Sequence, residues 1–455
     1  MKRRLVVAVC AAVLTGGVGI GVSYGEGGER GNVHNATGSE QAKQFAEASG
    51  KDTRAAKRMK PTAEKCKKGM AGEFRCDGID MLSRVTRAQL GLSFVNDIWG
   101  WTDPRTSDDY ALIGGTEGTV FVDITKPRKP DIVGTLPSNS LKGGGFWRDI
   151  KVFENHAFIV SEHDDHDMQV FDLTQLRSVE GAPVRFGETA LYDIADDGDA
   201  GNTHNLNINE DTGFAYLIGT SACSGGLHMV DVNDPTDPTF AGCFNDHGYI
   251  HDTQCVIYEG PDSEHRGREI CFNANAEFVG PTIEDIENTL SIVDVTDKEN
   301  PKPLARMFYG NDGYSHQGWL DSSQSYYLHG DELDEVLTGN KTRTRVWDVR
   351  DLDNPDVQGV FDNKTESIDH NLYTEDGKSY HSNYTSGLRI YDNTRLGQGK
   401  LSERGFFDLY PENDNATFEG GTWSNYPYYE GEKFVAVSSI DRGLFVLQPQ
   451  AKLRK

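Results

Sequence analysis

The stretch LHMVDVNDPTDPTFAGCF, residues 227–244, decides the fold, because its pattern recurs along most of the chain. It contains an apolar run that ends in Asp, a turn with Pro, and a second short apolar segment. Related runs begin at Val120, Met168, Leu290, Thr344, Leu388 and Gly443. The period is about fifty residues, which is typical of an array of supersecondary units.

The aspartate that ends each apolar run is predicted to have a structural role. Asp followed by a turn can accept a main-chain N–H through its side chain and so form an Asx turn. The six aspartates of this kind are Asp123, Asp172, Asp231, Asp294, Asp348 and Asp392.

Two further strands precede each apolar run, for example HNLNIN from His204 and FAYLIGT from Phe214. Each unit therefore has four antiparallel strands, and such units repeated around an axis form propeller blades. First strands are predicted near Val95, Trp147, Thr203, Ile250, Ser315, Asp369 and Thr422. The fold class is all-β, a seven-bladed β-propeller. Because the seventh unit lacks an outer strand, residues 78–86 are expected to supply it and close the ring.

The predicted organisation begins with a signal peptide over residues 1–25, since Lys2, Arg3 and Arg4 precede the apolar run LVVAVCAAVLTGGVGIGV. A membrane-spanning segment is the competing interpretation, but the run is short and rich in Gly. Residues 26–61 have few large apolar groups and are predicted to be a disordered linker. Residues 62–90 carry the closing strand, and residues 91–449 form the propeller. We expect a secreted, extracellular monomer without a membrane anchor.

The seven cysteines and the net charge of −26 limit the possible functions further. Cys10 lies in the signal peptide, and the other six favour disulfides in an exported protein. Proximity in the sequence predicts the pairs Cys66–Cys76, Cys223–Cys243 and Cys255–Cys271. The acidic charge disfavours nucleic acid and anionic lipid as partners.

The apolar runs, together with HNLNINEDTGFAYLIGT, HDTQCVIYEGP, SHQGWL and DHNLY, resemble the LVIVD-repeat propellers called the choice-of-anchor B family. The resemblance extends from about residue 73 to 447. It implies a propeller at the cell surface or beyond it, and this chain looks like an anchorless, released member. It implies no particular reaction.

The beginnings of the first strands are expected to meet at one mouth of the central channel. Four of the aligned positions are histidines from four consecutive blades. The predicted binding residues at this mouth are Asn96, Asp97, Arg148, Asp149, His204, Asn205, His251, Asp252, His316, Gln317, His370 and Asn371.

The ends of the second strands lie on the same face and add Glu162, His163, Glu277, His329, Asp331, Glu332 and His381. Imidazoles and carboxylates together indicate Zn or Cu, and the oxygens are also suited to Ca. The predicted metal ligands are His204, His251, His316, His370, His163, His329 and His381. The competing interpretation is a hydrogen-bonded structural network, and a third is direct contact of Arg148 and the histidines with an anionic or polar ligand.

Three functions are compatible with these sequence features. The first is a binding scaffold for a protein, glycan or small-molecule ligand at the His-rich mouth. The second is a metal-dependent hydrolase or oxidoreductase, for which Glu162, Glu277 and Asp331 are the candidate acids or bases. The third is a purely structural surface role. Tryptophans on the first strands, Trp99 and Trp319 among them, are expected in the core or in a stacking platform for sugar or peptide.

Overall fold

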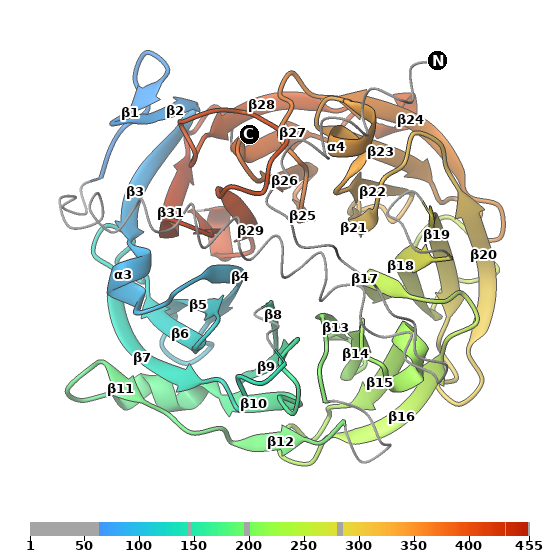
Figure 1. The fold of residues 1–455 in the computed structure, drawn as a ribbon, viewed down its shortest axis with the longest axis horizontal. Coiled ribbons are helices and arrows are strands. Elements are labelled where there is room, and N and C mark those ends of the chain that lie inside the picture. Colours follow the sequence, from blue (N-terminus) through green and yellow to red (C-terminus); the bar gives the residue numbers. More distant parts are fainter. Residues whose placement is uncertain (1–62, 144–146, 195–200, 280–284, 433, 454–455) are drawn as a thin grey trace, which may run out of the picture.

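The computed structural model describes residues 63–143, 147–194, 201–279, 285–432 and 434–453. Seven sheets, in each of which the four main strands are antiparallel, surround a central axis, with the first strand of each innermost (Figure 1). This confirms the predicted seven-bladed propeller. The expected signal peptide and linker lie outside the described residues.

Each blade has four main strands, and we number the blades 1 to 7 in the chain order of their innermost strands. The innermost strands are β4 (Val95–Thr102), β8 (Arg148–Phe153), β13 (Asn205–Asn209), β17 (Ile250–Ile257), β21 (Ser315–Leu320), β25 (Leu372–Glu375) and β29 (Thr422–Tyr426). The second strands are β5 (Asp109–Gly115), β9 (His156–Ser161), β14 (Phe214–Ile218), β18 (Glu269–Phe278), β22 (Tyr326–Asp331), β26 (Lys378–Asn383) and β30 (Val435–Ser439).

The third strands carry the repeated apolar run: β6 (Gly118–Asp123), β10 (Met168–Asp172), β15 (Leu227–Asp231), β19 (Ile286–Asp294), β23 (Arg343–Asp348), β27 (Gly387–Asp392) and β31 (Gly443–Pro449). The outer strands are β7 (Asp131–Pro137), β12 (Ala190–Tyr192), β16 (Thr239–Phe244), β20 (Lys302–Phe308), β24 (Asp356–Asp362), β28 (Ser402–Phe407) and β3 (Ile79–Val85). The remaining elements are β1 (Met70–Ala71), β2 (Phe74–Asp77), β11 (Val184–Arg185), α3 (Arg87–Leu90), α4 (Asp334–Thr338), η3 (Leu173–Ser178), η5 (Ala222–Gly225), η7 (Leu396–Gln398) and η8 (Glu430–Glu432).

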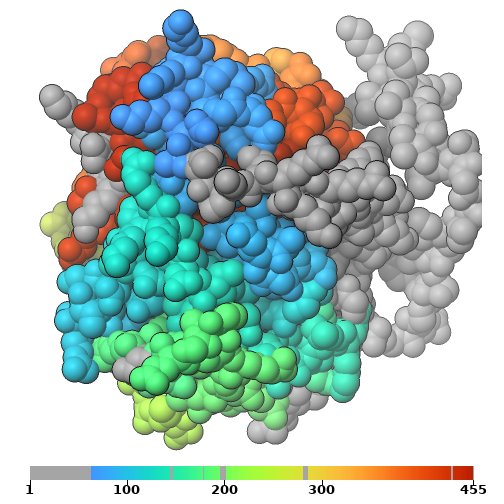
Figure 2. Space-filling view, turned by 90° about the vertical axis from the view of Figure 1, so that its left-hand side faces the viewer, coloured from blue at the N-terminus to red at the C-terminus, as the bar shows by residue number. Residues whose placement is uncertain are grey.

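Strand β3 closes the ring, as the sequence predicts. It pairs antiparallel with β31, and Arg84 lies opposite Phe445. The N-terminal residues in blue therefore lie against the C-terminal residues in red (Figure 2). Because both ends of the described chain share one blade, the propeller has no open seam.

The six aspartates at the ends of the apolar runs all form the predicted Asx turns. In each, Oδ1 accepts the main-chain N–H two residues later, for example from Asn233 to Asp231 at 3.0 Å. The repeat thus reflects turn chemistry and buried strands, not a catalytic motif.

Hydrogen bonds also join neighbouring blades near the axis. Five innermost-strand side chains accept an N–H from the innermost strand of the next blade, and we call them the connector residues. They are Asp97 to Ile150, Asp149 to Leu206, Asn207 to Cys255, Gln254 to Leu320 and Gln317 to Leu372, at 2.7–3.2 Å. Apolar side chains fill the space between blades, as in the cluster of Val160, Val170, Leu206 and Val230.

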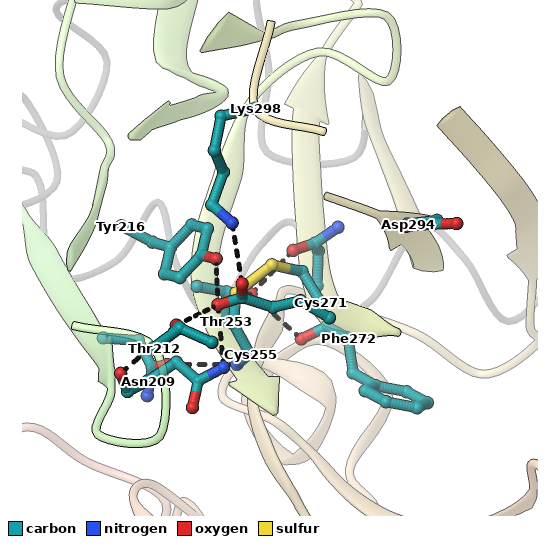
Figure 3. Close-up of a disulfide and its surroundings, with 12 residues drawn as sticks. Asn209, Thr212, Tyr216, Thr253, Cys255, Cys271, Phe272, Asp294 and Lys298 are labelled. Carbon is teal, nitrogen blue, oxygen red and sulfur yellow. Dashed lines mark hydrogen bonds and ion pairs between the residues drawn. A yellow bond between two sulfur atoms is a disulfide. The ribbon is translucent and has the colours of Figure 1, made fainter. Parts of the chain in front are cut away.

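All three predicted disulfides are present. Cys255–Cys271 joins β17 to β18, and Asn209, Thr212, Tyr216 and Lys298 gather beside it (Figure 3). Three disulfides indicate an oxidising, extracellular type of environment. Within the described part of the chain, the helices are all too short to cross a bilayer.

Candidate functional site

His204, His251, His316 and His370 lie side by side at one mouth of the channel, and we call them the mouth histidines. Successive ring centroids are 4.5, 4.2 and 4.3 Å apart. They come from the beginnings of the innermost strands of four consecutive blades. The alignment of the repeats therefore places these four residues correctly.

The hydrogen bonds of the rings determine which nitrogens face each other. Nδ1 of His251 is 2.8 Å from the carbonyl oxygen of His316, and Nδ1 of His370 is 2.6 Å from that of Trp423. A carbonyl oxygen only accepts, so both Nδ1 atoms carry hydrogen and both neutral rings present an Nε2 lone pair. Metal-binding imidazoles are commonly oriented by such bonds.

The contact between His204 and His251 needs a positive charge or a proton between the rings. Their Nε2 atoms are 2.8 Å apart, and Nδ1 of His204 is 2.6 Å from Oε1 of Glu162. Since Nε2 of His251 is an acceptor, His204 must donate a proton there, or a cation must lie nearby. Burial opposes protonation, yet Glu162 keeps the pKa of His204 above its usual value.

Glu332 brings a carboxylate to the other two mouth histidines. Its oxygens are 3.8 Å from Nε2 of His316 and 3.8 Å from Nε2 of His370. One ligand atom from each of the three residues lies within 4.8 Å of the others. Tyr384 donates its hydroxyl to Oε1 at 2.6 Å, while burial raises the pKa of Glu332 to about 7.

Aromatic side chains surround the mouth histidines. Trp147 stacks on Trp423 with centroids 4.2 Å apart, and the ring of Trp423 is also 4.2 Å from His370. None of the four histidine residues is more than 7% exposed. The low local dielectric strengthens every charge interaction in this group.

Several other predicted mouth residues serve the fold. Asp97, Asp149 and Gln317 are connector residues, and Asn205 donates from Nδ2 to the carbonyl of His251. Asn96 accepts the N–H of Asp97 through Oδ1. For these side chains the competing structural interpretation is the better description.

Arg148 and Asp252 lie beside the channel with partners of their own. Arg148 donates to the carbonyl of Gly115 and to Oγ of Ser138. Asp252 accepts its neighbour's N–H, and burial, with Asp149 nearby, raises its pKa to about 7. Asn371 is half-buried, and its carbonyl accepts the N–H of Ser382.

His163, His329 and His381 do not join the mouth histidines. Their rings contact the hydroxyls of Ser161, Ser315 and Ser379 respectively, at 2.9–3.0 Å. Burial lowers the pKa of His163 to about 4 and those of His329 and His381 to about 3. His329 and His381 belong to second strands, which lie one layer away from the axis, and His163 comes two residues after the end of the second strand β9.

Sequence reasoning placed Glu332 on the correct face but left it out of the metal-ligand set, and it missed Tyr384. Both follow second strands, Glu332 directly after β22 and Tyr384 directly after β26. Their position on the face of the mouth was readable from the repeat. How closely they approach the histidines depends on the conformation of the loops, and the repeat pattern does not predict that conformation.

A cavity of about 430 Å³ lies among the later residues of the innermost strands, away from the histidines. Its lining includes Trp99, Trp319, Tyr426 and Tyr428 together with Asn207 and Gln254. Because the side-chain oxygens of these two connector residues accept main-chain N–H groups, their amide NH₂ groups are the donors left for a ligand.

A match to a family model supports the repeat. A family model described as the LVIVD repeat matches residues 200–246, which include all four strands of blade 3, β13 to β16. No curated protein matches the chain. Similar solved structures include the computationally designed Ika8 protein, at 10% identity and a TM-score of 0.45, covering 77% of this chain and 82% of that one. Another is a protein from Lactobacillus plantarum, at 12% identity and a TM-score of 0.47, covering 76% and 88%.

Proposed function

We propose that this chain is an exported propeller of the choice-of-anchor B type that binds a transition-metal ion at the mouth histidines. His316, His370 and Glu332 would be the primary ligands, with His204 and His251 beside them. The protein is then a binding scaffold, and the ligand that it binds at the mouth of the channel is a metal ion.

The observation that carries the proposal is the pair of Nε2 atoms near one carboxylate. His316 and His370 each approach Glu332 to 3.8 Å, and the Nδ1–H of His370 is held by a carbonyl oxygen. Zn binds nitrogen and oxygen at about 2.0–2.2 Å, so ligands around one ion lie about 3–4 Å apart. Imidazole suits Zn, Cu and Ni, and it disfavours Mg and Ca.

The experiment is metal analysis of the purified full chain after equilibrium dialysis against Zn²⁺ or Cu²⁺. We expect one ion per chain in the wild type. The substitutions His316→Gln and His370→Gln should each lower that affinity at least tenfold, because removing one ligand of three weakens a site by about this much or more. His156→Gln, at the start of β9 and away from the mouth, is the matched control.

Two outcomes would contradict the proposal. One is a wild-type protein that binds no stoichiometric ion. The other is equal metal affinity in His316→Gln, His370→Gln and His156→Gln, which would place any bound ion elsewhere.

A second candidate function is recognition of a small glycan in the cavity at the other end of the channel. The lining supports it, since aromatic rings and amide donors together suit the apolar faces and hydroxyls of a sugar. Titration of cellohexaose, chitohexaose and maltohexaose against tryptophan fluorescence tests it. We expect one of the three to bind, and Trp319→Ala to abolish the signal; no response to any of them would reject this candidate.

A further inference from the structure

Three carboxylates lie buried together beside blades 5 and 6, and we call them the acidic cluster: Asp334, Glu335 and Asp369. One oxygen from each lies within 4.8 Å of the others. Asp334 and Glu335 belong to α4, which follows β22, and Asp369 comes just before His370. None of these three residues is more than 3% exposed.

Two of the six carboxylate oxygens in the acidic cluster are hydrogen-bonded by described residues of the protein, and the other four are not. Arg345 donates to Oδ2 of Asp334 at 2.9 Å, and the N–H of Asp331 donates to Oδ2 of Asp369 at 3.2 Å. Oδ1 of Asp334, Oδ1 of Asp369 and both oxygens of Glu335 have no hydrogen-bond partner within the described part of the chain. Buried carboxylate oxygens without partners are costly, so these four need an explanation.

Packing holds the acidic cluster in place. Gly330 passes so close to Asp369 that a Cβ at this position would lie 2.3 Å from Oδ2. Asp331 is fixed by the N–H groups of Gly313 and Tyr314 and by the hydroxyl of Tyr309. The close approach of Gly330 therefore holds Asp369 in place, and hydrogen bonds hold the neighbouring Asp331.

Positive charge from the protein is insufficient here. Arg345 is buried and pairs with Asp334 at 2.9 Å, and it lies 3.9 Å from Asp331. Arg343 acts from further away and is itself paired with Asp362. Among the described residues, Asp331 and the acidic cluster thus set four carboxylates against a single guanidinium that is ion-paired with them, that of Arg345.

We propose that the acidic cluster is a structural binding site for a hard divalent cation, Ca²⁺, held by Asp334, Glu335 and Asp369. The site goes beyond the transition-metal centre at the mouth and does not depend on it. Its ligands are all oxygens, which Ca²⁺ prefers and which Zn²⁺ and Cu²⁺ do not require.

Size and hydration favour Ca²⁺ over Mg²⁺. Ca–O distances of about 2.3–2.6 Å place ligands on opposite sides of the ion up to about 5 Å apart, which accommodates the spacing in the cluster. Mg²⁺ keeps several waters and demands a tighter octahedron. A buried pocket of carboxylates suits the ion that gives up its water more readily.

Calorimetric titration of chelator-treated full-length protein with CaCl₂ tests the site, with thermal unfolding measured in parallel. We expect one equivalent of Ca²⁺ to bind and to raise the melting temperature by mass action. Glu335→Gln should lower the affinity at least tenfold and remove the Ca²⁺-dependent rise. Glu366→Gln, an exposed carboxylate paired with Lys341, is the matched control and should behave as the wild type.

Stability without Ca²⁺ separates loss of a ligand from misfolding. Because Glu335→Gln removes repulsion among buried carboxylates, its metal-free form should melt at or above the temperature of the metal-free wild type. Asp369→Asn is a second variant with the same expectation. His316→Gln should retain Ca²⁺ binding, so the two metal sites can fail separately.

Two results would overturn the proposal. One is a wild type whose heat signal and melting temperature do not respond to roughly 10 mM Ca²⁺, which exceeds the range of extracellular Ca²⁺ modules. The other is undiminished Ca²⁺ affinity in both Glu335→Gln and Asp369→Asn.

Discussion

Two glutamates buried to the same degree have opposite surroundings. Glu269, at the start of β18, and Glu335, in α4, are each 3% exposed. Oε1 of Glu269 accepts from Asn209, Thr212 and Tyr216, and Oε2 pairs with Lys298 at 2.7 Å, whereas Glu335 has no such donor among the described residues. A buried carboxylate whose hydrogen-bond donors all come from the protein stabilises the fold. A buried carboxylate without such donors implies that a ligand binds there.

The largest expected effect comes from removing the glutamate that the protein fully satisfies. Glu269→Ala leaves Lys298 buried without its carboxylate and three donors without an acceptor, so we expect a loss of about 3–5 kcal/mol in the free energy of unfolding. Urea denaturation with and without Ca²⁺ is the measurement. The loss should be independent of Ca²⁺, unlike any effect of Glu335→Gln.

The double variant Glu269→Gln with Lys298→Met provides the control for Glu269→Ala. It removes both charges, so it should lose less stability than the sum of its single substitutions. Additive losses would mean that Glu269 and Lys298 do not act as a pair.

The disulfide beside Glu269 should have the next largest effect. Cys255 and Cys271 enclose a sequence separation of 16 residues. A loop of that size restricts the unfolded chain by about 3 kcal/mol, so the double substitution of both cysteines by Ala should lower the free energy of unfolding by about that amount. Wild type in reductant is the control; an unchanged denaturation midpoint in both samples would contradict the prediction.

A connector residue tests the same principle with a neutral side chain. Gln254→Leu leaves the buried N–H of Leu320 without its acceptor, which should cost about 1–2 kcal/mol. Gln398→Leu, on an exposed surface, should cost almost nothing. If both substitutions have equal effects on urea denaturation, the bond between blades 4 and 5 does not stabilise the ring.

The fold was predictable because its signals are local and repeated. Asp231 and the other five turn aspartates recur at one point of the unit, and the apolar runs alternate with them. Residues 78–86 were identified as the closing strand because the last unit lacked one. Each of these inferences needs only the pattern within a repeat and the rule that free sheet edges are avoided.

The site was predictable only in part. The four mouth histidines share a register, so alignment alone brings them together. Asp97, Asp149 and Gln317 share it too, but their partners are main-chain N–H groups of the next blade, and no sequence pattern marks those partners. Among the described residues, Glu335 has no hydrogen-bond donor because of how the side chains around it pack. The sequence pattern does not show this packing.

The smallest expected effect on stability comes from Asp103, whose carboxylate forms an ion pair with a solvent-accessible arginine. Arg177 donates two bonds to it at 2.7 and 2.8 Å, and this arginine, more than any other group, lowers the pKa of Asp103 to about 2. A pKa lowered in the folded state adds stability that is fully present above the unfolded value of 3.8 and is lost as pH falls through 2. Solvent screening limits this contribution to about 1 kcal/mol. The difference in unfolding free energy between wild type and Asp103→Asn should therefore shrink between pH 5 and pH 2. Arg177→Gln removes the same ion pair, so its difference from wild type should shrink in the same way. If neither difference changes with pH, the ion pair does not contribute to stability in this range.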